Sequence, residues 1–385
     1  MLRILHTSDL HLGKRFGRMP EALRGRLTEA RHGAIHRLAA AARDAGAGHV
    51  LVAGDLFDAE TPAPATLRQG LQAMAEDPAL TWVILPGNHD SLAADELWTR
   101  AAAEAPANVR LALRPEPVTL APGAVLLPAP CPARRPGRDL TEWMDAAETA
   151  PGDLRIGLAH GAVQSFGEEG ATDILAPDRA RRAGLDYLAL GDWHGQVRVD
   201  ARTWYSGAPE PDRFLHRAPG RALVVSLPGP GAEPEVRPVE TGEFGWETAE
   251  LALLPGEDPA ARLAALLPDP ARRRRTLLRL VATGRARLPE RAALLEAAGH
   301  AAPDFAFAEI RAEALALEPE AADLDAIDRA GALRDAAEAL LAEAADPALP
   351  DADRAAAAAA LARLHAYALE ETGDVAGGAS GGAAP

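Results

Sequence analysis

Residues 4–13 read ILHTSDLHLG, in which a short apolar run turns directly into a group of polar side chains. The run predicts a buried strand over residues 2–6. Asp9 and His11 follow it at a spacing of two residues, and alternate residues of an extended chain point the same way. We therefore expect both side chains on one side of the strand end, where a carboxylate and an imidazole can bind a divalent metal ion.

The same arrangement of a predicted strand followed by a polar cluster recurs four times. The later clusters are Gly54-Asp55, Gly87-Asn88-His89-Asp90, His160-Gly161 and Gly191-Asp192-Trp193-His194. Further strands are expected at residues 49–53, 81–85, 109–113, 124–127, 155–159, 186–190, 203–205 and 222–226. Helices expected at residues 23–46 and 65–76 complete an alternating pattern that predicts α/β layers. Because active sites of such proteins collect at the C-terminal ends of strands, the clusters should converge on one site.

These residue types suit the hydrolysis of phosphate esters. That reaction needs a nucleophile at neutral pH and positive charge to offset the transition state, and a pair of divalent ions about 3.5–4 Å apart supplies both. Asp55 is the candidate bridging ligand, because the glycine before it lets the backbone turn sharply. Asn88 offers a neutral carbonyl oxygen, and His160 and His194 offer imidazoles.

A different role is expected for His89 and Asp90. A histidine between a ligating Asn and an Asp is well placed to face the substrate instead of the metals. Asp90 would accept the proton-bearing ring nitrogen and set the tautomer. His89 would then stabilise the developing charge or protonate the leaving alkoxide.

The chain divides into a catalytic part and a smaller C-terminal part. The expected divisions are a catalytic domain at residues 1–226, a Pro/Gly-rich linker at 227–240, an α/β cap-like domain at 241–320, a helical segment at 321–372 and a disordered tail at 373–385. The stretch at 227–240 also fits an excursion at the edge of a sheet. Strands near 247–253, 276–282 and 305–315 alternate with helices in the cap-like domain.

The cysteine count, the lack of long apolar runs and the net charge exclude several classes of protein. The single cysteine, Cys131, cannot form an internal disulfide, which fits a reducing cytosol and excludes a cysteine-based zinc site. The N-terminus lacks a signal-peptide pattern and the chain lacks a long apolar run, so we expect a cytoplasmic protein without a membrane anchor. The formal net charge of -16 argues against a passive nucleic-acid coat, although the acidic residues concentrate in the C-terminal half.

The motifs SDLHLG, AGDLFD, PGNHD, LAHG and LGDWHG, in this order, resemble the signature of the calcineurin-like metallophosphoesterases. Within that superfamily, ILHTSDLHLGKRF, GDLFDAETP and WYSGAPEPDRF look closer to the SbcD/YhaO-type DNA repair exonuclease subunits. The resemblance covers residues 4–214. It implies a layered β-sandwich flanked by helices, followed by an α/β cap and helices that dock an SbcC-type coiled-coil ATPase.

The resemblance also implies a ligand set. One metal would be held by Asp9, His11, Asp55 and His194, and the second by Asp55, Asn88, His160 and the residue at position 192. The family usually has histidine there, whereas this chain has Asp192. An aspartate oxygen favours harder ions, so we expect two divalent ions, with Mn²⁺ preferred over Mg²⁺, Fe²⁺ or Zn²⁺.

The leading hypothesis is a DNA exonuclease or endonuclease subunit acting in DNA repair with an SbcC-type ATPase. The alternatives are a small-molecule phosphodiesterase, a phosphoprotein phosphatase, or a weakly active regulatory subunit in which Asp192 has weakened the metal pair. Lys14 and Arg15 are candidates for phosphate contact, and Trp193 could stack on a base or support its loop. Whether the chain forms a homodimer stays open.

Overall fold

The computed structural model describes residues 1–163, 174–215, 219–318, 324–325, 327–328 and 331–378. The chain divides into two compact units, Met1–Trp246 and Glu247–Pro385. Each unit is built around its own sheets and its own apolar core.

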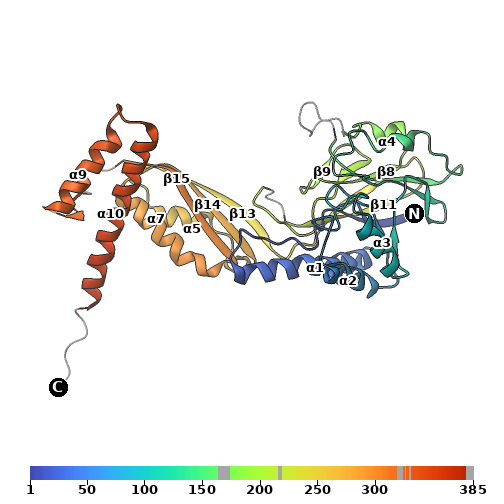
Figure 1. Ribbon diagram of the computed structural model, residues 1–385, viewed down its shortest axis with the longest axis horizontal. Helices are drawn as coiled ribbons and strands as arrows, with labels where there is room; N and C mark the ends of the chain where they lie inside the picture. The colour runs from blue at the N-terminus through green and yellow to red at the C-terminus, as the bar shows by residue number, and fades with distance from the viewer. Residues whose placement is uncertain (164–173, 216–218, 319–323, 326, 329–330, 379–385) are drawn as a thin grey trace, which may run out of the picture. The chain divides into compact units, whose positions relative to one another are not determined.

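The first unit, which carries the labels α1 to α4 in Figure 1, contains two six-stranded sheets. The order in the first sheet is β12 (Glu235–Glu240), β11 (Arg221–Leu227), β1 (Leu2–Thr7), β2 (His49–Val52), β3 (Thr81–Ile84) and β4 (Val109–Leu111). The order in the second sheet is β5 (Val118–Ala121), β6 (Ala124–Ala129), β7 (Leu154–His160), β8 (Tyr187–Gly191), β10 (Thr203–Tyr205) and β9 (Val197–Arg198). The strands β1 to β4 are mutually parallel, as are β6, β7, β8 and β10.

The sheets and helices form layers, because successive strand residues point to opposite faces. Leu5 packs in the core on the helical side of the first sheet, whereas Ile4 packs between the two sheets. The helices on the outer face of the first sheet are α1 (Glu21–Asp44), α2 (Pro64–Ala75) and α3 (Asp95–Glu104). The outer face of the second sheet is covered by η1 (Glu142–Asp145) and α4 (Arg179–Arg182). The expected α/β sandwich flanked by helices is confirmed.

The second unit contains a three-stranded sheet in the order β13, β14, β15. Its elements are β13 (Gly245–Leu253), α5 (Pro259–Leu266), α6 (Pro270–Arg273), β14 (Thr276–Ala286), α7 (Leu288–Ala301), η2 (Ala302–Asp304) and β15 (Phe307–Leu317). Leu263 of α5 and Leu294 of α7 share a core with Leu251 and Leu280 of the sheet, so both helices pack on it. Two further helices, α9 (Ala332–Ala345) and α10 (Asp351–Gly378), pack through another apolar cluster.

The boundaries expected after residue 226 differ from those of the structure, and the stretch at 227–240 matches the alternative of an excursion at the edge of a sheet. Six of the fourteen residues at 227–240 form strand β12, which pairs antiparallel with β11. Pro238 is tolerated there because β12 is an edge strand. Proline has no N–H, and an edge strand has no neighbouring strand on its outer side that would need one as a hydrogen-bond donor. The first unit also extends to Trp246, beyond the expected start of the cap at 241.

The expected tail at 373–385 is also partly wrong, because α10 runs on to Gly378. Once a helix is nucleated, each further residue adds at little cost. Residues 379–385 lie outside the described residues.

Candidate metal centre

The polar clusters meet at one edge of the sandwich, where the parallel strands end. The N–H of Asp9 donates to the Gly54 carbonyl at 3.1 Å, and the N–H of His11 donates to the Asp55 carbonyl at 3.0 Å. Asp9, His11 and Asp55 have φ angles of 56°, 44° and 54°, and Asp192 has 101°. Such left-handed conformations cost free energy in non-glycine residues and concentrate at functional sites, where surrounding contacts hold them.

Two glycines allow these loops to approach closely. A Cβ added at Gly54 would overlap the ring of His160, and one added at Gly87 would overlap the carboxylate and amide of Asp55. Side chains at either position would therefore push the loops apart. The glycines in the GD and PGN segments bring the polar groups together.

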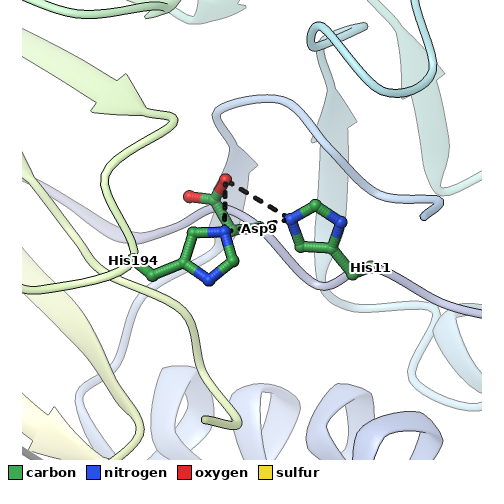
Figure 2. A group of neighbouring side chains, drawn as sticks. All are labelled: Asp9, His11 and His194. Carbon is green, nitrogen blue, oxygen red and sulfur yellow. Dashed lines mark hydrogen bonds and ion pairs between the residues drawn. The ribbon is translucent and has the colours of Figure 1, made fainter. Parts of the chain in front are cut away.

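Asp9, His11 and His194 form the first group of candidate ligands (Figure 2). His11 Nε2 and His194 Nε2 lie 3.2 Å apart, and each lies 3.9 Å from Asp9 Oδ1. Figure 2 shows the two imidazoles and the carboxylate pointing toward one another. Asp55 Oδ2 lies 3.6 Å from His11 Nε2, so a fourth oxygen donor reaches the same place.

A second group of candidate ligands shares Asp55 with the first. Asp55 Oδ2 lies 3.5 Å from His160 Nε2, and Asp192 Oδ1 lies 3.7 Å from the same nitrogen. Asn88 Nδ2 donates to Asp192 Oδ1 at 3.0 Å, which orients the Asn88 amide. Asp55 is therefore placed between the two groups, as a bridging ligand would be.

Two polar atoms of the second group indicate that a metal ion fits there. His160 Nε2 and Asn88 Oδ1 are buried and have no hydrogen-bond partner among the residues that the structure describes. Leaving such atoms unsatisfied is costly, and polar groups in protein interiors are nearly always paired. Both are good electron-pair donors to a divalent cation. The residues present therefore fit two metal ions.

The charges in the centre also favour cations. Burial would lower the pKa of His160, but the charges of Asp55, Asp9 and Asp192 raise it to about 9. Burial raises the pKa of Asp192, and the neighbouring charges of Asp9 and Asp55 add to that shift. Both shifts reflect negative charge gathered in a buried place, which bound cations would neutralise.

Each imidazole of the two groups is oriented through its Nδ1 atom. His160 Nδ1 lies 2.8 Å from the Ala53 carbonyl, and His194 Nδ1 lies 3.2 Å from Asp212 Oδ1. His11 Nδ1 lies 3.2 Å from Asp58 Oδ1. Such contacts direct Nε2 toward the metals and raise its basicity. The distance of 3.2 Å indicates that Asp58 orients the His11 ring.

The role expected for Asp90 is wrong. Its side chain is fully buried and accepts hydrogen bonds from the N–H of Gly87 at 2.7 Å and of Phe57 at 3.0 Å. The ring of His89 instead pairs through Nδ1 with the Asp58 carbonyl at 3.0 Å. The buried loop amides need an acceptor, and Asp90 satisfies them, so it ties two loops together without reaching the substrate.

The candidate substrate contacts differ in their surroundings. Lys14 Nζ lies 2.7 Å from Asp212 Oδ2 and 3.4 Å from Asp58 Oδ1, so it is engaged by carboxylates. Arg15 is exposed and lines a groove of about 850 Å³ that α1 and α2 border. Trp193 is 40% exposed between two candidate ligands.

Two residues near the centre, Asp212 and Arg213, were not expected from the sequence. Arg213 Nε donates a hydrogen bond to Asp212 Oδ1 at 3.0 Å. Arg213 Nη2 also lies 3.3 Å from both ring nitrogens of His194. Burial would raise the pKa of Asp212, but the hydrogen bond with His194 and the charges of His194, Arg31 and Lys14 lower it overall. Asp212 therefore stays a carboxylate beside the imidazole.

The family model described as calcineurin-like phosphoesterase matches residues 2–226. The chain belongs to this family. The protein YhaO of Bacillus subtilis (strain 168), described as an uncharacterized metallophosphoesterase, is 29% identical over 213 residues, 52% of this chain and 50% of its own length. The chain thus spans about half the length of this curated relative. The crystal structure of TT1561 of Thermus thermophilus aligns with a TM-score of 0.39 and 12% identity, covering 61% of this chain and 98% of that one.

Members of this family use divalent metal ions, and the clusters above supply candidate ligands for them. The chain therefore belongs to a family of metal-dependent phosphoesterases and carries candidate ligands for the metal ions. Within the described part of the chain, no helix combines the length and the apolar character needed to cross a membrane.

Proposed function

We propose that the chain hydrolyses phosphodiesters with two divalent cations, preferably Mn²⁺. The observation that carries this proposal is the position of Asp55, whose Oδ2 lies 3.6 Å from His11 Nε2 and 3.5 Å from His160 Nε2. The proposed ligands are Asp9, His11, Asp55 and His194 for one ion and Asp55, Asn88, His160 and Asp192 for the other. When bound, the two ions supply an activated water and positive charge at the transition state.

His89 is the proposed acid for the leaving group. The Asp58 carbonyl can only accept a hydrogen bond, so the contact at 3.0 Å places a proton on Nδ1 of His89. The remaining nitrogen, Nε2, carries a proton only when the ring is cationic. That proton would pass to the departing alkoxide. The N–H of His89 donates to Asp55 Oδ1 at 2.9 Å, which keeps the residue beside the metal ligands.

The charge of the centre favours a diester over a monoester. Two divalent cations bring four positive charges against the three carboxylates of Asp9, Asp55 and Asp192. While the bound water keeps its proton, the single remaining positive charge matches a phosphodiester, which carries one negative charge. A phosphomonoester carries about -1.5 to -2 at neutral pH. A histidine at position 192 would leave one more positive charge and suit the monoester better.

We propose DNA as the substrate, in a repair nuclease that works in the cytoplasm with an SbcC-type ATPase. The order of the motifs and the WYSGAPEPDRF segment support this assignment. The α/β unit from Glu247 and the helices α9 and α10 offer surfaces for DNA and for the ATPase. Arg15 would contact a phosphate and Trp193 would stack on a base, since every base offers a flat face.

The experiment uses the purified full chain with Mn²⁺. Bis-p-nitrophenyl phosphate, p-nitrophenyl phosphate, and end-labelled single- and double-stranded DNA are compared, with and without the ATPase. We expect cleavage of the diester and of DNA, abolished in Asp9→Asn but retained in Asp44→Asn, a matched change at an exposed aspartate. Hydrolysis of the small diester without any DNA cleavage would favour a small-molecule phosphodiesterase, and preference for the monoester would favour a phosphoprotein phosphatase.

The metal content of the purified chain distinguishes an active phosphoesterase from a regulatory subunit. Two equivalents of metal per purified chain support the catalytic proposal. One equivalent or none, together with failure to cleave either ester, would favour a weakly active regulatory subunit in which Asp192 has weakened the second site.

A further inference from the structure

A continuous path of polar contacts runs behind the first group of ligands. His11 Nδ1 lies 3.2 Å from Asp58 Oδ1, and the same oxygen lies 3.4 Å from Lys14 Nζ. Lys14 Nζ lies 2.7 Å from Asp212 Oδ2, and Asp212 Oδ1 lies 3.2 Å from His194 Nδ1. The path closes at the front, where the Nε2 atoms of His11 and His194 are 3.2 Å apart.

Lys14 occupies the middle of this path, with one carboxylate on each side. The Asp212 side chain is 1% exposed and the Lys14 side chain 24%, so solvent screens their ion pair only in part. A lysine suits this place, because its ammonium is a compact charge with three donors that can reach separate acceptors. The N–H of Lys14 also donates to the His11 carbonyl at 3.2 Å, which fixes the loop from which the side chain reaches back.

The two carboxylates depend on Lys14 in different degrees. Asp212 also receives a hydrogen bond from Arg213 Nε at 3.0 Å, whereas Asp58 relies on Lys14 and on the imidazole of His11. Without the ammonium, two negative groups would face each other with less countercharge. Repulsion would then separate them, and each would turn the imidazole that it holds.

We propose that Lys14 is a positioning residue that fixes the spacing of His11 and His194 through Asp58 and Asp212, rather than a contact for the substrate phosphate. The proposal rests on the metal centre of the proposed function. According to this proposal, the affinity of the first metal site depends on Lys14, which itself binds neither metal nor substrate. Outer contacts of this kind change metal affinity by about 10- to 100-fold when removed.

The test is a calorimetric titration of the metal-free full chain with Mn²⁺, which needs no substrate. Lys14→Met should weaken one of the two binding steps by about 10- to 100-fold and leave the other unchanged. Lys14→Arg, which keeps the charge, should recover part of the loss. Arg18→Met is the matched control, because it removes an exposed positive charge from the same loop and should leave both steps unchanged.

A second variant distinguishes a direct loss of metal affinity from a folding defect. Asp212→Asn leaves Lys14 paired with Asp58 and should weaken the same binding step. The double variant should lose less than the sum of the two single losses, since both act on one path. Thermal unfolding of each metal-free variant shows whether a loss of affinity comes from a loss of fold.

The outcomes separate this inference from the proposed function. If both single variants bind Mn²⁺ within twofold of the wild type, the inference is overturned. A raised KM with unchanged metal affinity would also overturn it, because that result identifies a substrate contact. Wild-type chain that binds two ions but cleaves no ester would refute the proposed activity and leave the inference standing, whereas chain that binds no metal would refute both.

Discussion

Replacement of Gly54 by alanine tests whether the loops meet as the structure has them. Gly54 has φ +90°, and a Cβ at this position would overlap the ring of His160. An alanine in a left-handed conformation costs roughly 1–2 kcal/mol. The overlap adds a second effect, because His160 must move away from the Ala53 carbonyl that holds its Nδ1 atom at 2.8 Å. We therefore expect Gly54→Ala to bind the second Mn²⁺ ion at least 10-fold more weakly.

Gly152→Ala is the matched control. Gly152 has φ +88°, almost the same φ as Gly54, but no atom outside its chain neighbours lies within 4 Å of the added Cβ. Both variants should lose about 2–4 °C of Tm for each kcal/mol of strain in a unit of this size. Calorimetric titration with Mn²⁺ should then separate them, with the control resembling the wild type. Equal Mn²⁺ affinity in Gly54→Ala and Gly152→Ala would refute the placement of His160 against the Gly54 loop.

Three further predictions concern stability, catalysis and specificity. Burial lowers the pKa of His6 to about 3, so below pH 6.5 the unfolded chain gains a proton that the folded chain cannot accept. The free energy of unfolding should therefore fall by about 2 kcal/mol between pH 6.5 and pH 5. The urea midpoint of the wild type should fall with it, and an equal pH dependence of the midpoint in His6→Gln would contradict this prediction. His89→Gln should lower kcat for bis-p-nitrophenyl phosphate by about 10²- to 10⁴-fold while Mn²⁺ affinity is kept; lost affinity would identify a ligand instead. Asp192→His should raise kcat/KM for p-nitrophenyl phosphate relative to the diester, and an unchanged ratio would refute the charge argument.

The sequence predicts the layered fold well where strands are long and buried. The strand expected at 155–159 is β7 (Leu154–His160), because the mostly apolar residues after Arg155 are a strong strand signal. The helix α3 (Asp95–Glu104) was missed, since its N-cap residue, Ala94, makes no side-chain hydrogen bond and so carries no start signal. The strand β5 (Val118–Ala121) was missed because it is short and forms the edge of its sheet.

The candidate ligands could be predicted because each follows a strand whose end is fixed by the sheet. The outer contacts could not, since they come from irregular loops. Asp212 lies between β10 and β11, and its approach to His194 depends on packing that no local spacing records. Asp90 shows the opposite error, because being next to His89 in sequence does not reveal which way a side chain turns. The direction of the Asp90 side chain follows from the N–H groups of Gly87 and Phe57, which need an acceptor.

The net charge is divided unevenly between the two units. Of the 40 basic and 56 acidic residues in the chain, 26 and 32 lie in residues 1–246, which gives that unit -6 and leaves 14 basic and 24 acidic residues, or -10, for residues 247–385. Affinity for DNA comes largely from basic groups that displace counterions from phosphates. If the second unit acts as the proposed cap, this charge would let it contribute shape more than phosphate contacts. In the proposed nuclease, attraction for DNA would therefore come from the metal ions and from half-exposed arginines such as Arg213, and the proposed ATPase would supply the remainder.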